Sequence, residues 1–131
     1  MTHRRRSPRD ERGLVSVELT IVVPLLVWWL MLIVQYGLWW HAKQVADAAA
    51  AEAVDVAQTV DGTAADGEAA ALSLLDTSGN LSGVSVSVDR GADVVTAEVQ
   101  GDAPKLVPGW GWGVTARSQA PVERPLSASE R

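Results

Sequence analysis

Few side chains in this sequence could do chemistry, and their spacing excludes most kinds of active site. The chain of 131 residues has no cysteine, so disulfides, thiol nucleophiles and cysteine-ligated zinc are ruled out. The only histidines are His3 and His41, too few for a histidine metal site. No Ser-His-Asp arrangement can be assembled, because the one external histidine, His41, is expected at the membrane surface. The acidic residues are scattered as on a solvated surface. We therefore expect no enzymatic activity, no metal, no cofactor and no small-molecule substrate.

One acidic residue, Glu18, stands apart from the others because it is the only charged residue between positions 14 and 40. A charge at the centre of a membrane helix costs about 2.5–3.5 kcal/mol, and less toward the ends. Cleavage after Gly13 would make Glu18 the fifth residue of a chain that begins at Leu14. Glu18 of a neighbouring subunit could then neutralise the new α-amino group. The alternative is that Glu18 is tolerated at the level of the lipid headgroups.

The charge is sorted along the chain, which indicates two differently solvated sides. The net charge of −5 divides into +3 for residues 1–13, −1 for Glu18 and −7 for residues 41–131. Residues 19–40 carry no charge, and about 20 apolar residues suffice for a helix to cross a bilayer. The positive-inside rule predicts a cytoplasmic leader at 1–13, a transmembrane helix at 14–40 and an extracytoplasmic remainder. The acidic balance argues against nucleic-acid binding.

Two other interpretations of the apolar stretch remain open. A cleaved secretory signal fits the basic start and the small residues around Asp47, but its apolar region runs only about 7–15 residues. A buried helix of a soluble protein is the other, although such helices rarely run this long without charge.

The apolar helix carries a proline and one distinctive face. Pro24 lacks a backbone donor and its ring clashes with the carbonyl of Thr20, so we expect a kink there. A face with large rings and an amide follows the helical spacing i, i+4, i+7, i+11. Because polar side chains bond across membrane helices, we expect this face to pack against another helix, with lipid contact as the alternative. Its residues are Trp28, Leu32, Gln35 and Trp39.

Further aromatic residues lie where the apolar stretch ends and near the C-terminus. Tyr36, Trp39 and Trp40 are placed as membrane-interface anchors. Trp110 and Trp112 lie in a glycine-rich segment and are expected to cap a small core. Contact with a partner or a membrane surface is the alternative for this second pair.

The remainder, residues 41–120, predicts helix followed by sheet. The alanine-rich helix is expected to continue to Val60, and a second helix to span Ala64–Asp76 with Leu72 and Leu75 inward. The inward stripe of the first helix is expected at Val45, Ala49, Ala53, Val56 and Val60. Valines then alternate with polar residues at 84–89, 95–100 and, more weakly, 114–120. The expected class is α+β, with a small antiparallel sheet of about three strands and a disordered tail at 121–131.

The basic leader, Gly13, Glu18, Pro24 and the alanine-rich helix together resemble the TadE-like minor pseudopilins of the tight-adherence (Tad/Flp) pilus machinery. The resemblance covers roughly residues 12–60, and Leu19 departs from the aromatic residue common there. It implies a structural, non-enzymatic component of a bacterial cell membrane. It further implies processing by a prepilin peptidase that recognises Gly13, Leu14 and Glu18. The implied partners are other pilins or pseudopilins and inner-membrane platform proteins.

A single-pass membrane anchor for a binding module unrelated to pili is the alternative function. In that case Glu18 and Pro24 would be incidental, and the external domain would bind a receptor or a cell-wall component.

Overall fold

The structure, a computed structural model, consists of two units that share one long helix. It describes the backbone of residues 8–78 and 81–124, with side chains from residue 17 onward in these ranges. The two units are Met1–Val34 and Gln35–Arg131. The expected leader and the expected tail lie partly outside the described residues.

The elements follow the order predicted from the sequence, and the predicted α+β class is confirmed. They are α1 Pro8–Gln58, α2 Ala64–Ser78, β1 Ser82–Arg90, β2 Val94–Asp102 and β3 Gly113–Pro121. Helix α1 begins earlier than the expected Leu14, at a proline whose fixed φ suits the first turn of a helix. It continues through Pro24, and the kink expected there stays a prediction.

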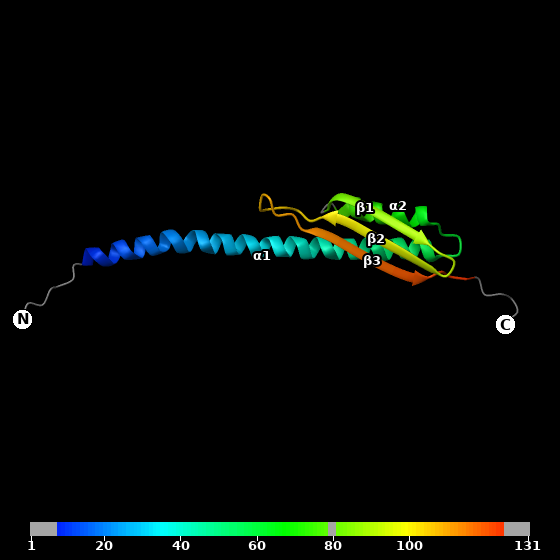
Figure 1. The fold of residues 1–131 in the computed structure, drawn as a ribbon, viewed down its shortest axis with the longest axis horizontal. Coiled ribbons are helices and arrows are strands. Elements are labelled where there is room, and N and C mark those ends of the chain that lie inside the picture. Colours follow the sequence, from blue (N-terminus) through cyan, green and yellow to red (C-terminus); the bar gives the residue numbers. More distant parts are fainter. Residues whose placement is uncertain (1–7, 79–80, 125–131) are drawn as a thin grey trace, which may run out of the picture. The chain divides into compact units, whose positions relative to one another are not determined.

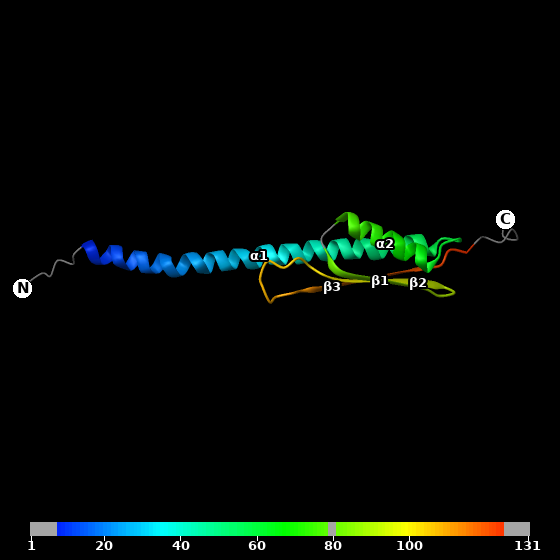
Figure 2. The ribbon, with the colours of Figure 1, turned by 90° about the horizontal axis from the view of Figure 1, so that it is seen from above.

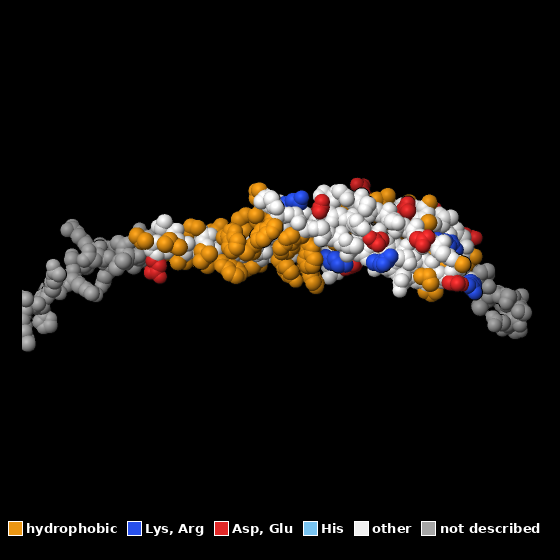
Figure 3. All heavy atoms as spheres, viewed as in Figure 1, with side chains coloured by type: hydrophobic (Ala, Val, Ile, Leu, Met, Phe, Trp, Pro, Cys, Tyr) orange, Lys and Arg blue, Asp and Glu red, His pale blue; other side chains and the backbone are white. Residues whose placement is uncertain are grey.

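The first unit is an apolar helical segment whose side chains face outward. Ile21 is 67% exposed and Ile33 is 64% exposed, and Figure 3 shows hydrophobic atoms covering this segment. Within the described part of the chain, α1 is the one helix long and apolar enough to cross a bilayer, and none of its most apolar window is buried. A core helix of a soluble protein would be covered, so this exposure argues against that alternative. The helix fits a single-pass membrane anchor.

In the second unit, a helical layer covers one face of the sheet (Figures 1 and 2). The layer consists of residues 35–58 of α1 together with α2. The strands are antiparallel in the order β1-β2-β3, with Val88 opposite Ala97 and Val99 opposite Ala116. These side chains point toward the helices and are buried, whereas the alternate positions are mostly polar.

Alanine makes up most of the helical side of the core. The buried residues of α1 there are Ala42, Ala46, Ala49, Ala50, Ala53, Val54 and Ala57. The predicted stripe was partly wrong: Ala49 and Ala53 are buried, but Val60 is 50% exposed and lies beyond the end of the helix. Val45 and Val56 are only partly buried. Because the side chains that face the sheet are mostly methyl groups, the helix can lie close to the inward valines of the strands.

A tight turn joins the two helices. The amide of Gly62 donates to the carbonyl of Thr59 at 3.1 Å after α1 ends. The hydroxyl of Thr63 accepts a bond from the amide of Asp66 at 3.1 Å, and the Asp66 carboxylate accepts one from the Thr63 amide at 3.1 Å. This reciprocal pair is a capping box, which satisfies backbone donors at the start of α2.

Helix α2 turns a different face inward from the one expected. Leu75 is buried as predicted, at 6% exposure, but Leu72 is 48% exposed and its prediction was wrong. Gly67 and Ala71 are buried in its place. A Cβ on Gly67 would lie 2.5 Å from the carbonyl oxygen of Ala53. The two helices are therefore so close that glycine is required at their contact, and this closeness selects the small face of α2.

Replacing Gly67 with alanine should therefore destabilise the domain by about 1–3 kcal/mol, because the added methyl group must push α2 away from backbone atoms. Thermal unfolding of the full chain in detergent, followed by far-ultraviolet circular dichroism, measures this loss. Gly37→Ala is the matched control: Gly37 is also helical, but a Cβ there meets no atom within 4 Å. Its unfolding temperature should stay the same or rise. Equal effects of the two substitutions would contradict the close contact.

Candidate functional site at the junction of helix and loop

Gln35 is the first residue of the second unit and has an unusual environment. Its side chain is 1% exposed, and it is the one buried polar or charged side chain among the residues whose burial the structure describes. Its Nε2 donates to the carbonyl of Pro104 at 3.0 Å. Its Oε1 accepts from the amide of Leu106 at 2.9 Å. The amide thus pairs with two backbone groups of the connection between β2 and β3, which satisfies the polar groups on both sides.

That connection, residues 103–112, is called the β2–β3 loop below. Its base is closed by the Ala103 amide, which donates to the Trp112 carbonyl at 3.2 Å. At its tip the Trp110 amide donates to the Val107 carbonyl at 3.2 Å, around Gly109 with φ of 83°. A proline followed by a glycine of positive φ is the pattern of a type II turn. The loop therefore has a defined shape, with hydrogen bonds at its base, its tip and its contact with Gln35.

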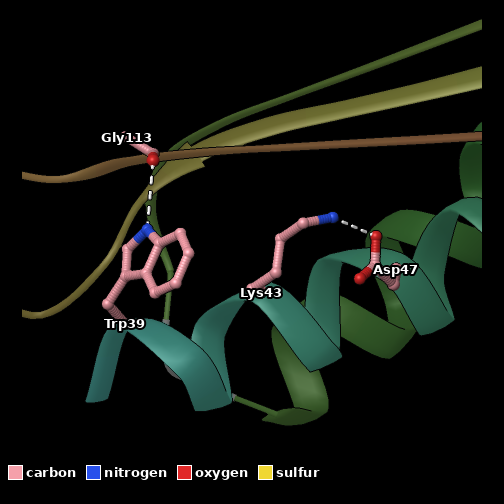
Figure 4. Close-up of polar contacts among 4 residues, drawn as sticks. All are labelled: Trp39, Lys43, Asp47 and Gly113. Carbon is pink, nitrogen blue, oxygen red and sulfur yellow. Dashed lines mark hydrogen bonds and ion pairs between the residues drawn. The ribbon is translucent and has the colours of Figure 1, made fainter. Parts of the chain in front are cut away.

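Trp39 holds the other side of the loop, one helical turn beyond Gln35. Its ring nitrogen donates to the carbonyl of Gly113 at 3.4 Å, where β3 begins (Figure 4). Its ring packs edge-on against Trp112, with centroids 6.1 Å apart. Tyr36 lies against the Trp39 ring at 5.9 Å, and an open, mostly apolar groove runs between these aromatic residues and the loop. One turn further, Lys43 pairs with Asp47 on the same helix (Figure 4).

Two of the four residues expected to pack against another helix contact this chain itself. The amide of Gln35 bonds to the loop, and Trp39 packs against Trp112, so these two side chains have intramolecular partners. The reason is that residues 35–58 of α1 belong to the folded domain, which the spacing of the face does not reveal. Trp28 remains 49% exposed in the first unit, beside Trp29. A packing role for Trp28 and Leu32 stays a prediction.

The expected interface anchors include two exposed aromatic residues. Tyr36 is 52% and Trp40 is 53% exposed, and their rings lie 6.4 Å apart. Trp110 and Trp112 were expected to cap a small core, and they differ in the structure. Trp112 packs against Trp39, whereas Trp110 is 45% exposed and caps no core. Trp110 follows the Pro-Gly turn at the tip of the loop.

The structure also places the residues expected to guide processing. Glu18 lies on α1 with its side chain exposed. Gly13 and Leu14 lie on the same helix, but in the part whose side chains are outside the described residues. Among the described residues, no group of three or more His, Cys, Asp or Glu is placed to hold a metal ion.

The β2–β3 loop is a partner of Gln35 that the sequence did not predict. A glutamine at the end of a long apolar run signals a buried polar group that needs a partner. The partner backbone groups belong to Pro104 and Leu106, which are far away in the sequence and carry no side-chain signature of this contact.

The Gln35→Ala substitution tests the contact. It would leave the Pro104 carbonyl and the Leu106 amide unpaired, at a cost of about 1–3 kcal/mol each where they stay buried. We expect hydrogen exchange at the Leu106 amide, followed by NMR in detergent micelles, to accelerate about tenfold or more. Gln44→Ala, an exposed position on the same helix, should leave this rate unchanged. Unchanged protection of Leu106 in the Gln35 variant would refute the contact.

Comparison with known proteins gives a family match over the part of the chain that includes Glu18 and Gln35. Residues 13–55 match the family model described as TadE-like protein. No curated protein and no solved structure matches the chain. The matched segment begins at Gly13, includes Pro24 and Gln35, and ends within the alanine-rich part of α1. The chain therefore carries a TadE-like segment at residues 13–55, which confirms the family resemblance drawn from its sequence.

Proposed function

We propose that this protein is a minor pilin-like component, a pseudopilin, of a Tad/Flp-type pilus assembly and secretion system. The observation that carries the proposal is the TadE-like match at residues 13–55, because it includes Gly13, Glu18 and the whole apolar stretch. The role is structural: the helix packs with other helices in the membrane or in a filament. The proposal assigns no catalytic step to the chain.

The proposed location is a bacterial cell membrane, crossed once by α1. Residues 1–13 carry a net charge of +3 and residues 41–131 a net charge of −7, which supports a cytoplasmic N-terminus and an extracytoplasmic domain. An exposed apolar segment that precedes the domain in the sequence supports the single crossing. The apolar side chains from Val17 to Val34 would then be covered by lipid tails or by neighbouring helices.

Glu18 favours association of α1 with a neighbouring subunit. In the chain by itself its carboxylate is exposed on a helix flanked by apolar side chains, including Val17 at 63% and Leu19 at 55%. A carboxylate in this position is costly in lipid unless a positive group lies nearby. A prepilin peptidase that cuts after Gly13 would create such a group, the α-amino group of Leu14. We propose that the amine of one subunit pairs with Glu18 of the next.

The helix face available for packing is narrower than the sequence pattern predicts. Gln35 and Trp39 are engaged within the domain, which leaves Trp28 and Leu32 as the residues of that face in the membrane segment. We propose that these two contact a neighbouring pilin or an inner-membrane platform protein. Close packing, and not a polar bond from Gln35, would then hold the helices together.

Processing can be tested directly by intact-mass spectrometry of the protein extracted from membranes of cells that contain a prepilin peptidase. The expected mature chain begins at Leu14. In cells without the peptidase, the same measurement should find the chain uncut at this position. A chain that stays uncut in both cells, or one that begins near residue 48, would contradict processing after Gly13.

The pairing role of Glu18 can be tested with Glu18→Ala. Pilus assembly should be strongly impaired, whereas membrane insertion should persist, because removing a charge does not weaken the apolar span. Electron microscopy of surface pili and carbonate extraction of membranes measure the two effects. Glu52→Ala, which removes an exposed acid outside the apolar stretch, is the control and should assemble normally. Normal pili in the Glu18 variant would rule out the pairing.

A further inference from the structure

The β2–β3 loop presents large apolar side chains to its surroundings. Leu106 and Trp110 are each 45% exposed, and neither belongs to the buried core. Elsewhere in the second unit the face seen in Figure 3 is dotted with acidic and basic side chains. The amide of Trp110 closes the Pro-Gly turn, so the backbone at this exposed residue is held by a hydrogen bond.

The position of the loop along α1 is fixed by Gln35. This residue follows Val34, the last residue of the apolar unit, and it binds the loop through two hydrogen bonds. The exposed rings of Tyr36 and Trp40 lie on the same stretch of helix. Tryptophan and tyrosine favour the headgroup level of a bilayer, where their rings contact both apolar and polar surroundings. The loop therefore lies beside the part of α1 that would emerge from a membrane.

The charge of the loop is opposite to that of the domain that carries it. Lys105 is the only charged residue among residues 103–112, whereas residues 41–131 have a net charge of −7. The alkyl chain of Lys105 lies over Gly111, where an added Cβ would come within 2.7 Å of its Cε. Its Nζ would lie 2.9 Å from the same Cβ, and the side chain as a whole is exposed. A lysine whose methylenes lie on a surface and whose ammonium stays accessible suits the boundary between lipid tails and phosphates.

We propose that the β2–β3 loop is a second membrane contact: Leu106 and Trp110 enter the interfacial layer of the leaflet that faces the domain, and Lys105 binds lipid phosphate. The occupant of this surface is lipid, because the loop joins apolar tips with a single cation, and it lies beside Gln35 and Trp39, which directly follow the apolar stretch in the sequence. The domain is then held against the bilayer at two points, α1 and the loop. This inference requires the membrane span of α1 but not the pilus role.

Fluorescent labels on single cysteines can test the contact, since the natural chain has none. Leu106→Cys and Trp110→Cys are each labelled with nitrobenzoxadiazole in the full chain, reconstituted into phosphatidylcholine and phosphatidylglycerol vesicles. We expect blue-shifted emission and several-fold stronger quenching by lipids with a nitroxide near the headgroup than by aqueous iodide. Ser87→Cys, on the exposed face of the sheet, is the control and should show the reverse preference.

Two results would overturn the proposal. Labels at 106 and 110 that behave like the label at 87 would show that the loop is in water. Labels shielded from iodide but not quenched by lipid nitroxide would show that protein, such as a second copy of this chain, covers the loop. The vesicles contain this chain alone, so either result leaves the pilus role to be judged by the assembly experiment.

The part played by Gln35 has its own readout in the same vesicles. Gln35→Ala combined with Trp110→Cys should reduce the lipid quenching of the label, because the loop loses its fixed level beside α1. Quenching that persists undiminished would contradict a positioning role for Gln35. Gln44→Ala in the same background is the control and should leave the quenching unchanged.

Discussion

The side-chain amide of Gln35 is buried and must therefore be hydrogen-bonded. The second unit brings a loop against it that supplies these bonds. A buried unpaired amide costs more than a single hydrogen bond gains, so a partner for both of its ends is a strict requirement. The backbone of the β2–β3 loop supplies both partners. This contact joins the start of the domain to a loop near its end, and it brings Trp112 and the first residue of β3 against Trp39. Gln35 and Trp39 thus hold the end of β2 and the start of β3 against α1.

Small side chains make the remainder of the domain possible. The alanines of α1 bury little apolar area each, but they allow the helix to approach the valines of β2 and β3 closely. Gly67 applies the same principle to the contact between the two helices. A domain without phenylalanine can form a closed core in this way, and its tryptophans are left for the region where α1 meets the loop. The chemical character of α1 changes at that region, from exposed apolar residues before Gln35 to an alanine face that the sheet covers.

The sequence predicts the elements well because their patterns are local. Alternating valines fix the strands, and Asp61-Gly62 fixes the end of α1 to within two residues. Packing faces are harder to predict, since periodicity shows that a face exists but not what covers it. Leu72 was expected inside because leucine is apolar, yet the closeness of the helices admits only Gly67 and Ala71 there. Gln35 was expected to bond to another helix. Its partners in the structure are backbone groups of a loop, 69 and 71 residues away in the sequence, and no local pattern indicates them. The TadE-like character could be predicted, because Gly13, Glu18 and Pro24 lie in one short segment.

In this structure Gln35 bonds within its own chain and not across to a neighbouring helix. Solid-state NMR of the protein in lipid bilayers tests it most directly, with isotopically labelled chains diluted into an excess of unlabelled chains. We expect a correlation between the side-chain nitrogen of Gln35 and the carbonyl carbon of Pro104 that persists on dilution. The bond within the chain would be contradicted if that correlation were absent and Gln35 instead showed contacts only in samples that mix differently labelled chains.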